Sequence, residues 1–293
     1  MSLKRAVNAA LVRATGYQLQ KPMPRRQARL EVGPVDRLLE KPTFILCTVR
    51  SGSTLLRVLL NSHSQIHSPQ EMHMRDIGVK MRGEYSEKSL AEIGLDERRL
   101  EYLLWDRMLH RELAESGKRL LVNKTPSDVL IVDRILECWP DARFVYLLRH
   151  PGAIARSRHA ARPQDTAERN TAMVLRYAQA VEDARRAHPG HSVRYEDLAA
   201  DPEAETRRLC EFLGVPWEPA MLDYGEFDHG RFLSGLGDWS EKIKSGRVQP
   251  ASEAPPEEQT PPELREIAEA WGYLPDVRAG RDTTRRPTSS TTG

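Results

Sequence analysis

Short apolar runs alternate with longer amphipathic stretches along most of the chain. The first run, residues 42–49, is rich in β-branched and apolar residues, and a polar turn and then a helical pattern follow it. Runs of this kind are typical of buried parallel strands, and their alternation with helices indicates βαβ units. The predicted strands are residues 42–49, 119–122, 143–148 and 191–195. The pattern therefore predicts an α/β fold of three layers, with a parallel central sheet and helices on both faces.

The segments between these strands show helical periodicity and contain residues that favour the start or the end of a helix. Pro151 suits the first turn of a helix, and Gly214 suits the position just after a helix end. The predicted helices are residues 55–61, 127–138, a helix from Pro151, 202–213 and 263–271, and residues 71–118 are charged and mostly helical in pattern.

No internal repeat or long linker divides the 293 residues, so we expect one domain over residues 1–275. Residues 1–40 are expected to form an N-terminal arm, and residues 72–118 a helical insert on the substrate side. The segment 249–262 is rich in Pro, Glu and Ser and is expected to be a solvated loop. Residues 276–293 lack apolar periodicity and are expected to be a disordered tail.

Charge and cysteine content narrow the functional classes. Lys plus Arg number 44 and Asp plus Glu 42, a balance that argues against a nucleic-acid partner. No run of 18 apolar residues is present, so stable membrane insertion is not expected. Cys47, Cys138 and Cys210 have the spacing of neither a disulfide framework nor a metal site, which fits a cytoplasmic protein without a metal. The oligomeric state, a homodimer included, is left open.

A polar turn, Arg50-Ser51-Gly52-Ser53-Thr54, joins the first predicted strand to the helix after it. The amides and the dipole at a helix N-terminus favour an anion, and Gly52 lets the backbone approach it. Ser53 and Thr54 add hydroxyl donors, and Arg50 adds a charged fork. An ordinary capped turn would have a similar sequence, so this loop alone leaves its role open.

Taken with its neighbours, the turn at residues 50–54 resembles the 5′-phosphosulfate loop of the sulfotransferases that use 3′-phosphoadenosine-5′-phosphosulfate (PAPS). Arg50 at its first position is similar to the tyrosylprotein and bacterial branches, whereas the cytosolic members usually have Lys there. The family fold is an α/β, P-loop-like domain, in agreement with the strand and helix pattern. The resemblance covers about residues 42–248 and implies PAPS as cofactor, adenosine 3′,5′-bisphosphate as product and no metal.

Two further motifs support the resemblance. Residues 144–151, continuing to Ser157, are similar to the segment of the family that binds the 3′-phosphate. Arg149 would offer that phosphate a bidentate donor, and Ser157 would lie about two turns into the next helix. Tyr195 lies in a Tyr-Glu-Asp stretch that resembles the family's adenine-side segment. A surface salt bridge for Arg149 and a core position for Tyr195 are the alternatives.

A fourth segment, residues 235–239, resembles the Gly-Asp-Trp stretch of the family. The cytosolic members have basic residues just before it, against the 3′-phosphate, but residues 232–234 here are Phe, Leu and Ser. That basic clamp is therefore absent, and Lys242, Lys244 and Arg247 are the candidates to replace it.

Sulfuryl transfer needs in-line placement, neutralised oxygens and a stabilised leaving group. Arg50 can bind the sulfuryl and 5′-phosphate oxygens. Lys124 lies in an Asn-Lys-Thr-Pro segment similar to the family's catalytic lysine segment, and this resemblance implies that it donates to the bridging oxygen. The alternative for Lys124 is a solvated loop cation.

The acceptor hydroxyl must also lose a proton to a general base. In the cytosolic members a His lies two residues after the lysine, but Pro126 holds that position here. Glu71 is our candidate base, because the tyrosylprotein branch similarly places a catalytic Glu after the first helix and the turn that follows it. His73 and His67 are its rivals, since imidazole can accept a proton near neutral pH.

The sequence thus predicts a sulfotransferase that acts on a hydroxyl of a small molecule, which we expect to be a sugar, a lipid or a secondary metabolite. One alternative is a P-loop kinase, which would need a Lys in the loop where Gly52 stands and an acidic magnesium ligand. The other is a non-catalytic adenosine-bisphosphate binding protein, which would not need Glu71. Residues 72–118 and 158–171 are expected to shape the acceptor pocket.

Overall fold

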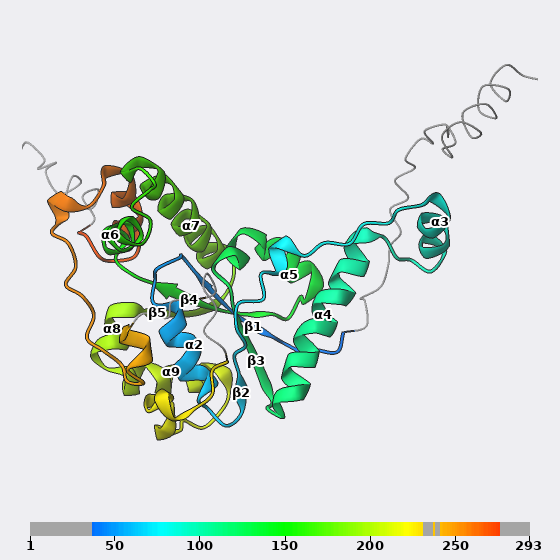
Figure 1. Cartoon of the computed structure of the whole chain (residues 1–293), viewed down its shortest axis with the longest axis horizontal. Coiled ribbons are helices and arrows are strands. Elements are labelled where there is room, and N and C mark those ends of the chain that lie inside the picture. The colour runs from blue at the N-terminus through cyan, green and yellow to red at the C-terminus, as the bar shows by residue number, and fades with distance from the viewer. Residues whose placement is uncertain (1–36, 231–236, 238–240, 276–293) are drawn as a thin grey trace, which may run out of the picture. The chain divides into compact units, whose positions relative to one another are not determined.

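The fold was obtained as a computed structural model, which describes residues 37–230, 237 and 241–275. Its centre is a sheet of five parallel strands in the order β2-β3-β1-β4-β5 (Figure 1). The strands are β1 Thr43–Cys47, β2 Ile66–His67, β3 Leu120–Lys124, β4 Arg143–Leu148 and β5 Gly190–Arg194. The predicted α/β class with a parallel, P-loop-like central sheet is confirmed.

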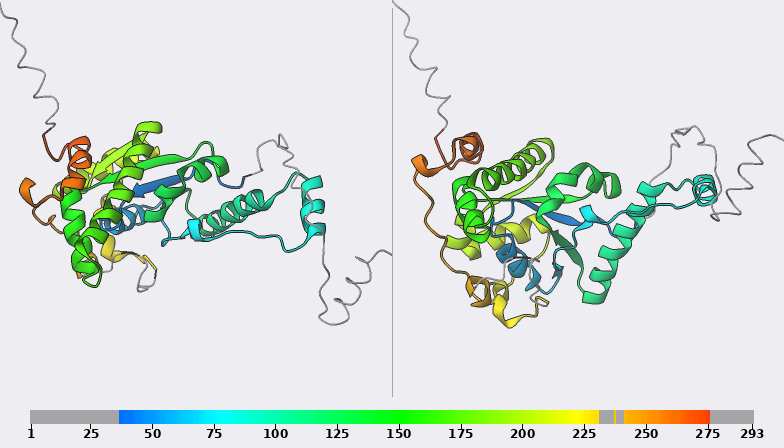
Figure 2. Two further views of the ribbon diagram at one scale, coloured as in Figure 1. Left: turned by 90° about the horizontal axis from the view of Figure 1, so that it is seen from above. Right: turned by 45° about the horizontal axis from the view of Figure 1, so that its top comes forward.

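Helices cover both faces of the sheet, as the two views of Figure 2 also show. The α-helices are α2 Ser53–Asn61, α3 Glu84–Glu92, α4 Glu97–Ser116, α5 Val132–Cys138, α6 Pro151–Ala161, α7 Ala167–Ala187, α8 Tyr195–Ala200, α9 Pro202–Leu213, α10 Glu241–Lys244 and α11 Arg265–Ala270. The 3-10 helices are η1 Met74–Asp76, η2 Pro126–Ile131, η3 Pro219–Leu222, η4 Tyr224–Glu226, η5 Glu257–Gln259 and η6 Pro262–Leu264.

The side chains of β1 point alternately to the two faces of the sheet, and the buried core has one part on each face. Phe44 and Leu46 lie in one buried cluster with residues of α4, α5, α6, α7 and α11. Ile45 and Cys47 lie in a second cluster, on the other face, with residues of α2, α8 and α9. Because successive side chains of a strand point to opposite faces, one strand serves both layers. All five residues of β1 are buried, which explains why its sequence is a continuous apolar run.

Several element boundaries follow the sequence closely. The strand at residues 143–148 and the helix at residues 202–213 have their predicted limits, and Gly214 ends that helix with φ 76°. The helix predicted over residues 127–138 begins instead as the 3-10 helix η2 and becomes α-helical at Val132. Tyr195, predicted as the end of a strand, is the first residue of α8.

Strand β2 and helix α7 are among the elements that were not predicted. Strand β2 has only two residues, too few for a period of two to be visible. The segment at residues 158–171, which we expected to be a loop, is helical at both ends, because α6 runs to Ala161 and α7 begins at Ala167. The buried stripe of α7 includes Val174, Ala178 and Val181 among many charged residues, so its apolar signal is weak.

The expectation of a solvated loop at residues 249–262 was wrong in part. Pro255 and Thr260 are buried, and both approach Gly152 at the start of α6 so closely that a Cβ there would lie 3.0 Å and 2.9 Å from them. Most of the predicted N-terminal arm, and all of the predicted tail at residues 276–293, lie outside the described residues. Among the described helices, none has both the length and the apolar character needed to cross a membrane.

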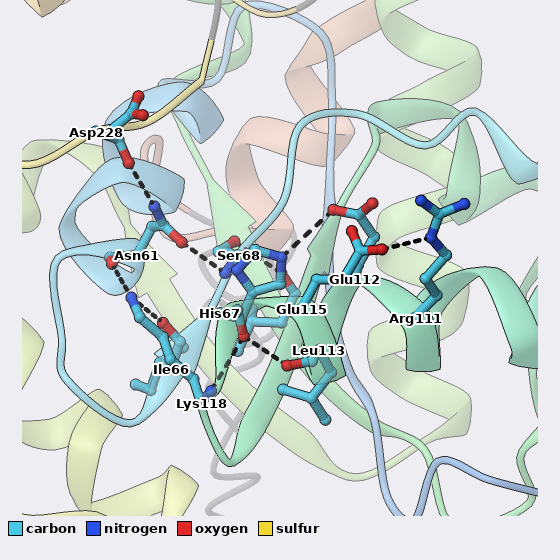
Figure 3. A network of polar contacts seen from close by, with 12 residues as sticks. Asn61, Ile66, His67, Ser68, Arg111, Glu112, Leu113, Glu115, Lys118 and Asp228 are labelled. Atoms are coloured by element: carbon cyan, nitrogen blue, oxygen red, sulfur yellow. Dashed lines mark hydrogen bonds and ion pairs between the residues drawn. The ribbon is translucent and has the colours of Figure 1, made fainter.

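A polar network at the far end of α2 joins it to the sheet (Figure 3). The ammonium of Lys118 donates to the carbonyl oxygens of Asn61 at 2.6 Å and Ile66 at 3.1 Å. Asn61 is the last residue of α2, so this cation lies at the negative end of the helix dipole. The Asn61 side chain accepts from the amide of Ser68 at 3.0 Å, and the Ser68 hydroxyl donates to the carbonyl of Val122 at 2.7 Å. These bonds fix the backbone that leads from β2 toward residue 71.

We predict that Lys118→Met destabilises the fold by about 1–3 kcal/mol, because two carbonyl oxygens lose a charged donor. Equilibrium unfolding in urea would show this as a lower midpoint at an unchanged slope. Lys88→Met is the control, since Lys88 is exposed and pairs only with Glu84 four residues earlier. Equal midpoints for the two variants would contradict the role given to Lys118.

Candidate active site

The turn between β1 and α2 has a backbone that few sequences adopt. Arg50 and Gly52 both have positive φ, 64° and 87°, and such a conformation strains a residue with a side chain by about 1 kcal/mol or more. The Ser51 hydroxyl donates to the carbonyl of Thr48 at 2.8 Å and is buried. The turn therefore directs the N-terminus of α2 toward the cavity beside it.

This cavity has a volume of about 610 Å³ and lies at the carboxyl ends of the strands. Eight of the ten residues that the sequence predicted for the site line it. They are Arg50, Gly52, Ser53, Thr54, Glu71, Arg149, Ser157 and Tyr195. The other two are Ser51, whose hydroxyl is used inside the turn, and Lys124, which reaches the site through Glu71.

Arg149 connects the phosphate turn to the opposite side of the cavity. Its guanidinium donates to the carbonyl of Arg50 at 2.6 Å and lies 4.6 Å from the ring centroid of Tyr195. Burial lowers the pKa of Arg149. Arg50 in turn donates through Nε to the hydroxyl of Ser157 at 3.2 Å. The two predicted phosphate motifs thus contact each other directly.

Tyr195 packs closely against the phosphate turn. A Cβ placed on Gly52 would lie 2.2 Å from Cδ2 of Tyr195, well inside any allowed contact. Glycine is therefore required at position 52 for two reasons, its positive φ and the closeness of this ring.

Glu71 and Lys124 form an ion pair beside the cavity. Lys124 ends β3 and is 1% exposed, and Glu71 is 9% exposed, so both charges are largely removed from water. Nζ of Lys124 also donates a hydrogen bond to Oε1 of Glu71. Nε2 of His73 lies 3.2 Å from the other carboxylate oxygen. Lys124 is therefore not the solvated loop cation considered as its alternative.

His67, the second rival base, lies elsewhere. Its ring faces helix α4, where Nε2 is 3.6 Å from a carboxylate oxygen of Glu112 (Figure 3). His67 does not line the cavity, whereas Pro126 does.

Two buried groups close to Lys124 remain mostly protonated at neutral pH. Burial raises the pKa of Cys47 to about 11 and the pKa of Asp128 to about 8. The Asp128 carboxyl also accepts from the side-chain amide of Asn123 at 2.7 Å. The protonated thiol and carboxylic acid carry little negative charge. They therefore compete little with Glu71 for the ammonium of Lys124.

Arg57 and Thr125 support the site but were not singled out in the sequence. The Thr125 hydroxyl accepts from the amide of Met72, next to Glu71, at 3.1 Å. Arg57 on α2 is buried and donates to the carbonyl of Ser68 at 3.1 Å. Burial lowers the pKa of Arg57 to about 10, and the nearby Glu71 opposes this shift. A lone arginine inside the apolar run at residues 55–60 was the available signal.

Of the three candidates for the missing basic clamp, Lys242 lines the cavity and Lys244 and Arg247 do not. Nζ of Lys242 lies 3.4 Å from the Ser252 hydroxyl. Arg158 of α6 and Arg162, the residue just after this helix, also line the cavity. Residues 232–236 and 238–240 lie outside the described part of the chain. Within the described part, no group of three or more His, Cys, Asp or Glu side chains is placed to hold a metal ion.

Several known proteins are similar to this chain. Protein-tyrosine sulfotransferase 1 of Danio rerio is 26% identical over 200 residues, which cover 62% of this chain and 56% of the relative. The nodulation protein NoeE of Sinorhizobium fredii is 27% identical over 233 residues, which cover 67% of this chain and 55% of the relative. The chain thus spans about half the length of these curated relatives.

Two solved structures are similar over their whole length. The sulfotransferase domain of the Synechococcus PCC 7002 olefin synthase has a TM-score of 0.61 and 25% identity, and the match covers 83% of this chain and 99% of that domain. The sulfotransferase domain from the curacin biosynthetic pathway has a TM-score of 0.59 and 26% identity, and the match covers 80% of this chain and 99% of that domain. A sequence model described as "Sulfotransferase family" matches residues 42–219, a range that includes the phosphate turn, Glu71, Lys124, Arg149 and Tyr195. The chain therefore belongs to the sulfotransferase family.

Proposed function

We propose that this chain transfers a sulfuryl group from PAPS to a hydroxyl of a small-molecule acceptor, with Glu71 as the general base. The observation that carries this proposal is the convergence of three features on one cavity. These are the N-terminus of α2, the contact between Arg149 and Tyr195, and the ion pair of Glu71 with Lys124.

The charge of the cavity supports a polyanionic nucleotide as cofactor. Five cationic side chains line the cavity, and Glu71 is the single acidic one among its described lining residues. The cations are Arg50, Arg149, Arg158, Arg162 and Lys242. Arginine binds phosphate and sulfate oxygens through paired N–H donors, so this lining can neutralise such a ligand with protein groups alone.

We assign each end of PAPS to a part of this lining. Arg50, Gly52, Ser53 and Thr54, with the backbone amide of Ser51, would bind the 5′-phosphosulfate at the start of α2. Arg149 and Ser157 would bind the 3′-phosphate, and Tyr195 would pack near the adenine. PAPS supplies the activated sulfuryl group, and the chain's own residues do the rest of the chemistry.

In the proposed reaction the acceptor oxygen bonds to sulfur while the bond from sulfur to the 5′-phosphate oxygen breaks. Glu71 takes the acceptor proton, and Lys124 donates a hydrogen bond to the oxygen on which negative charge develops. The Glu71–Lys124 contact supports this division of roles, because it holds the cation directly beside the base, which lines the cavity.

The acceptor class and the setting of the reaction are part of the same proposal. The two similar solved domains belong to an olefin synthase and to the curacin biosynthetic pathway, which supports a secondary metabolite over a sugar or a lipid. We further propose one catalytic domain over residues 1–275, with the helical insert at residues 72–118 on the acceptor side, acting in the cytoplasm.

Adenosine 3′,5′-bisphosphate should raise the melting temperature without magnesium. At one hundred times its Kd a ligand adds about 2.7 kcal/mol, a rise of roughly 5 °C for a chain of this size. Differential scanning fluorimetry measures it. A rise only with magnesium and ATP would contradict the proposal and favour a kinase.

Glu71→Gln should lower turnover by about 10²–10⁴-fold, the usual effect of losing a general base. Its affinity for adenosine 3′,5′-bisphosphate, measured by calorimetry, should stay close to that of the unchanged chain. His73→Asn tests the rival base, because asparagine tolerates the positive φ of 46° at this position. His67→Asn is the control outside the cavity. Near-normal turnover in Glu71→Gln, or a larger loss in His73→Asn, would overturn the assignment.

Gly52→Ala should weaken binding of adenosine 3′,5′-bisphosphate by about tenfold or more, because the new methyl group displaces Tyr195. Gly214→Ala is the matched control. Gly214 also has a positive φ, 76°, but a Cβ there meets nothing within 4 Å. The two variants share backbone strain and differ in the contact with Tyr195. Equal affinities in calorimetry would show that this contact does not matter for binding.

A further inference from the structure

The last described part of the chain, residues 263–275, lies beyond the region that the family model matches. We call it the C-terminal segment. It contains α11, which packs against α6 and α7 and is drawn in orange to red beside them in Figure 1. None of its residues lines the cavity. It contacts instead the two turns that carry Arg149 and Tyr195.

Tyr273 makes the central contact of this segment. Its hydroxyl donates to Oε2 of Glu196 at 2.6 Å, and Oε1 of Glu196 accepts from the amide of His150 at 3.1 Å. The guanidinium of Arg194 lies 4.2 Å from the centroid of the Tyr273 ring. Burial and the Glu196 carboxylate raise the pKa of Tyr273, so the hydroxyl keeps its proton and remains a donor. One carboxylate therefore joins the C-terminal segment to the backbone at the end of β4.

The residues in this contact are direct neighbours of the proposed cofactor residues. His150 follows Arg149, and Glu196 follows Tyr195. On the cavity side, the guanidinium of Arg149 lies 4.6 Å from the ring centroid of Tyr195. Behind this pair, the backbone amide of His150 is hydrogen-bonded to the Glu196 carboxylate. A shift of Glu196 would therefore move the backbone on both sides of the nucleotide site.

His150 extends the same link to α6, the helix that carries Ser157. Its Nδ1 accepts from the amide of Gly152 at 3.1 Å and so caps the start of that helix. Burial lowers the pKa of His150, which favours the neutral ring that can accept this bond. The rings of His150 and Tyr273 also pack edge to face, with their centroids 5.3 Å apart.

A separate contact holds the C-terminal segment in place. The indole of Trp271 donates to Glu182 of α7 at 3.1 Å, and Glu182 is buried and paired with Arg185 and Arg186. Because this anchor is independent of Tyr273, the Tyr273 hydroxyl can be removed without releasing the whole segment.

We propose that docking of the C-terminal segment through Tyr273 and Glu196 positions Arg149 and Tyr195 and is thermodynamically coupled to nucleotide binding in the cavity. Tyr273 is thus a positioning residue. This inference rests on the proposed function, since it takes adenosine 3′,5′-bisphosphate as the ligand. Coupling is reciprocal, so the nucleotide must strengthen docking of the segment by the factor by which docking strengthens nucleotide binding.

Hydrogen exchange in the full chain tests the coupling without any substitution. Saturating adenosine 3′,5′-bisphosphate should slow amide exchange in residues 263–275 by about fivefold, although the ligand does not touch them. Calorimetry on the same sample reports binding separately. Binding with unchanged exchange in the segment would overturn this inference alone. No binding at all would overturn the proposed function and this inference with it.

Tyr273→Phe tests the role of the Tyr273 hydroxyl. It should weaken the affinity for adenosine 3′,5′-bisphosphate by about fivefold and reduce the protection of residues 263–275. Tyr146→Phe is the matched control, because Tyr146 is buried and its hydroxyl donates to the carbonyls of Ala184 and His188, both at 3.0 Å. The control should lower the melting temperature and leave the affinity unchanged. Equal losses of affinity in both variants would reduce Tyr273 to a general stabilising role and overturn the proposal.

Discussion

The parallel direction of the strands is the constraint on which the site depends. Because β1, β3, β4 and β5 all run the same way, their carboxyl ends meet at one edge of the sheet. Each end delivers one side chain of the candidate site to that edge, and these are Arg50, Lys124, Arg149 and Tyr195. The buried core on both faces keeps the strands in register, so residues far apart in the sequence reach contact distance.

Contacts between these side chains then make one site out of four strand ends. Arg149 binds the carbonyl of Arg50 and stacks on Tyr195, and Tyr195 lies against Gly52. Two charges, Glu71 and Lys124, are withdrawn from water together, which is tolerable only because they are paired. The C-terminal segment, which lies beyond the part of the chain that the family model matches, reaches the same strand ends from behind through Tyr273.

Features set by local sequence could be predicted well. The apolar run of β1, the polar turn after it and the Arg at the end of β4 each have a local signature, and eight of the ten predicted site residues line the cavity. Features set by tertiary contacts could not be predicted. Helix α7 buries a stripe of small residues whose apolar signal is weak, and Tyr195 begins a helix where the sequence predicted the end of a strand. The supporting roles of Thr125 and Tyr273 depend on partners at least 53 residues away in sequence.

The proposed reaction is transfer of a sulfuryl group from PAPS to an acceptor hydroxyl. Incubation of the full chain with PAPS labelled in its sulfuryl group, without magnesium, and a panel of hydroxyl compounds tests it most directly. We expect label to move to at least one acceptor, with adenosine 3′,5′-bisphosphate released in equal amount. Binding of PAPS without transfer to any acceptor in a broad panel, or transfer of phosphate from ATP instead, would contradict the account.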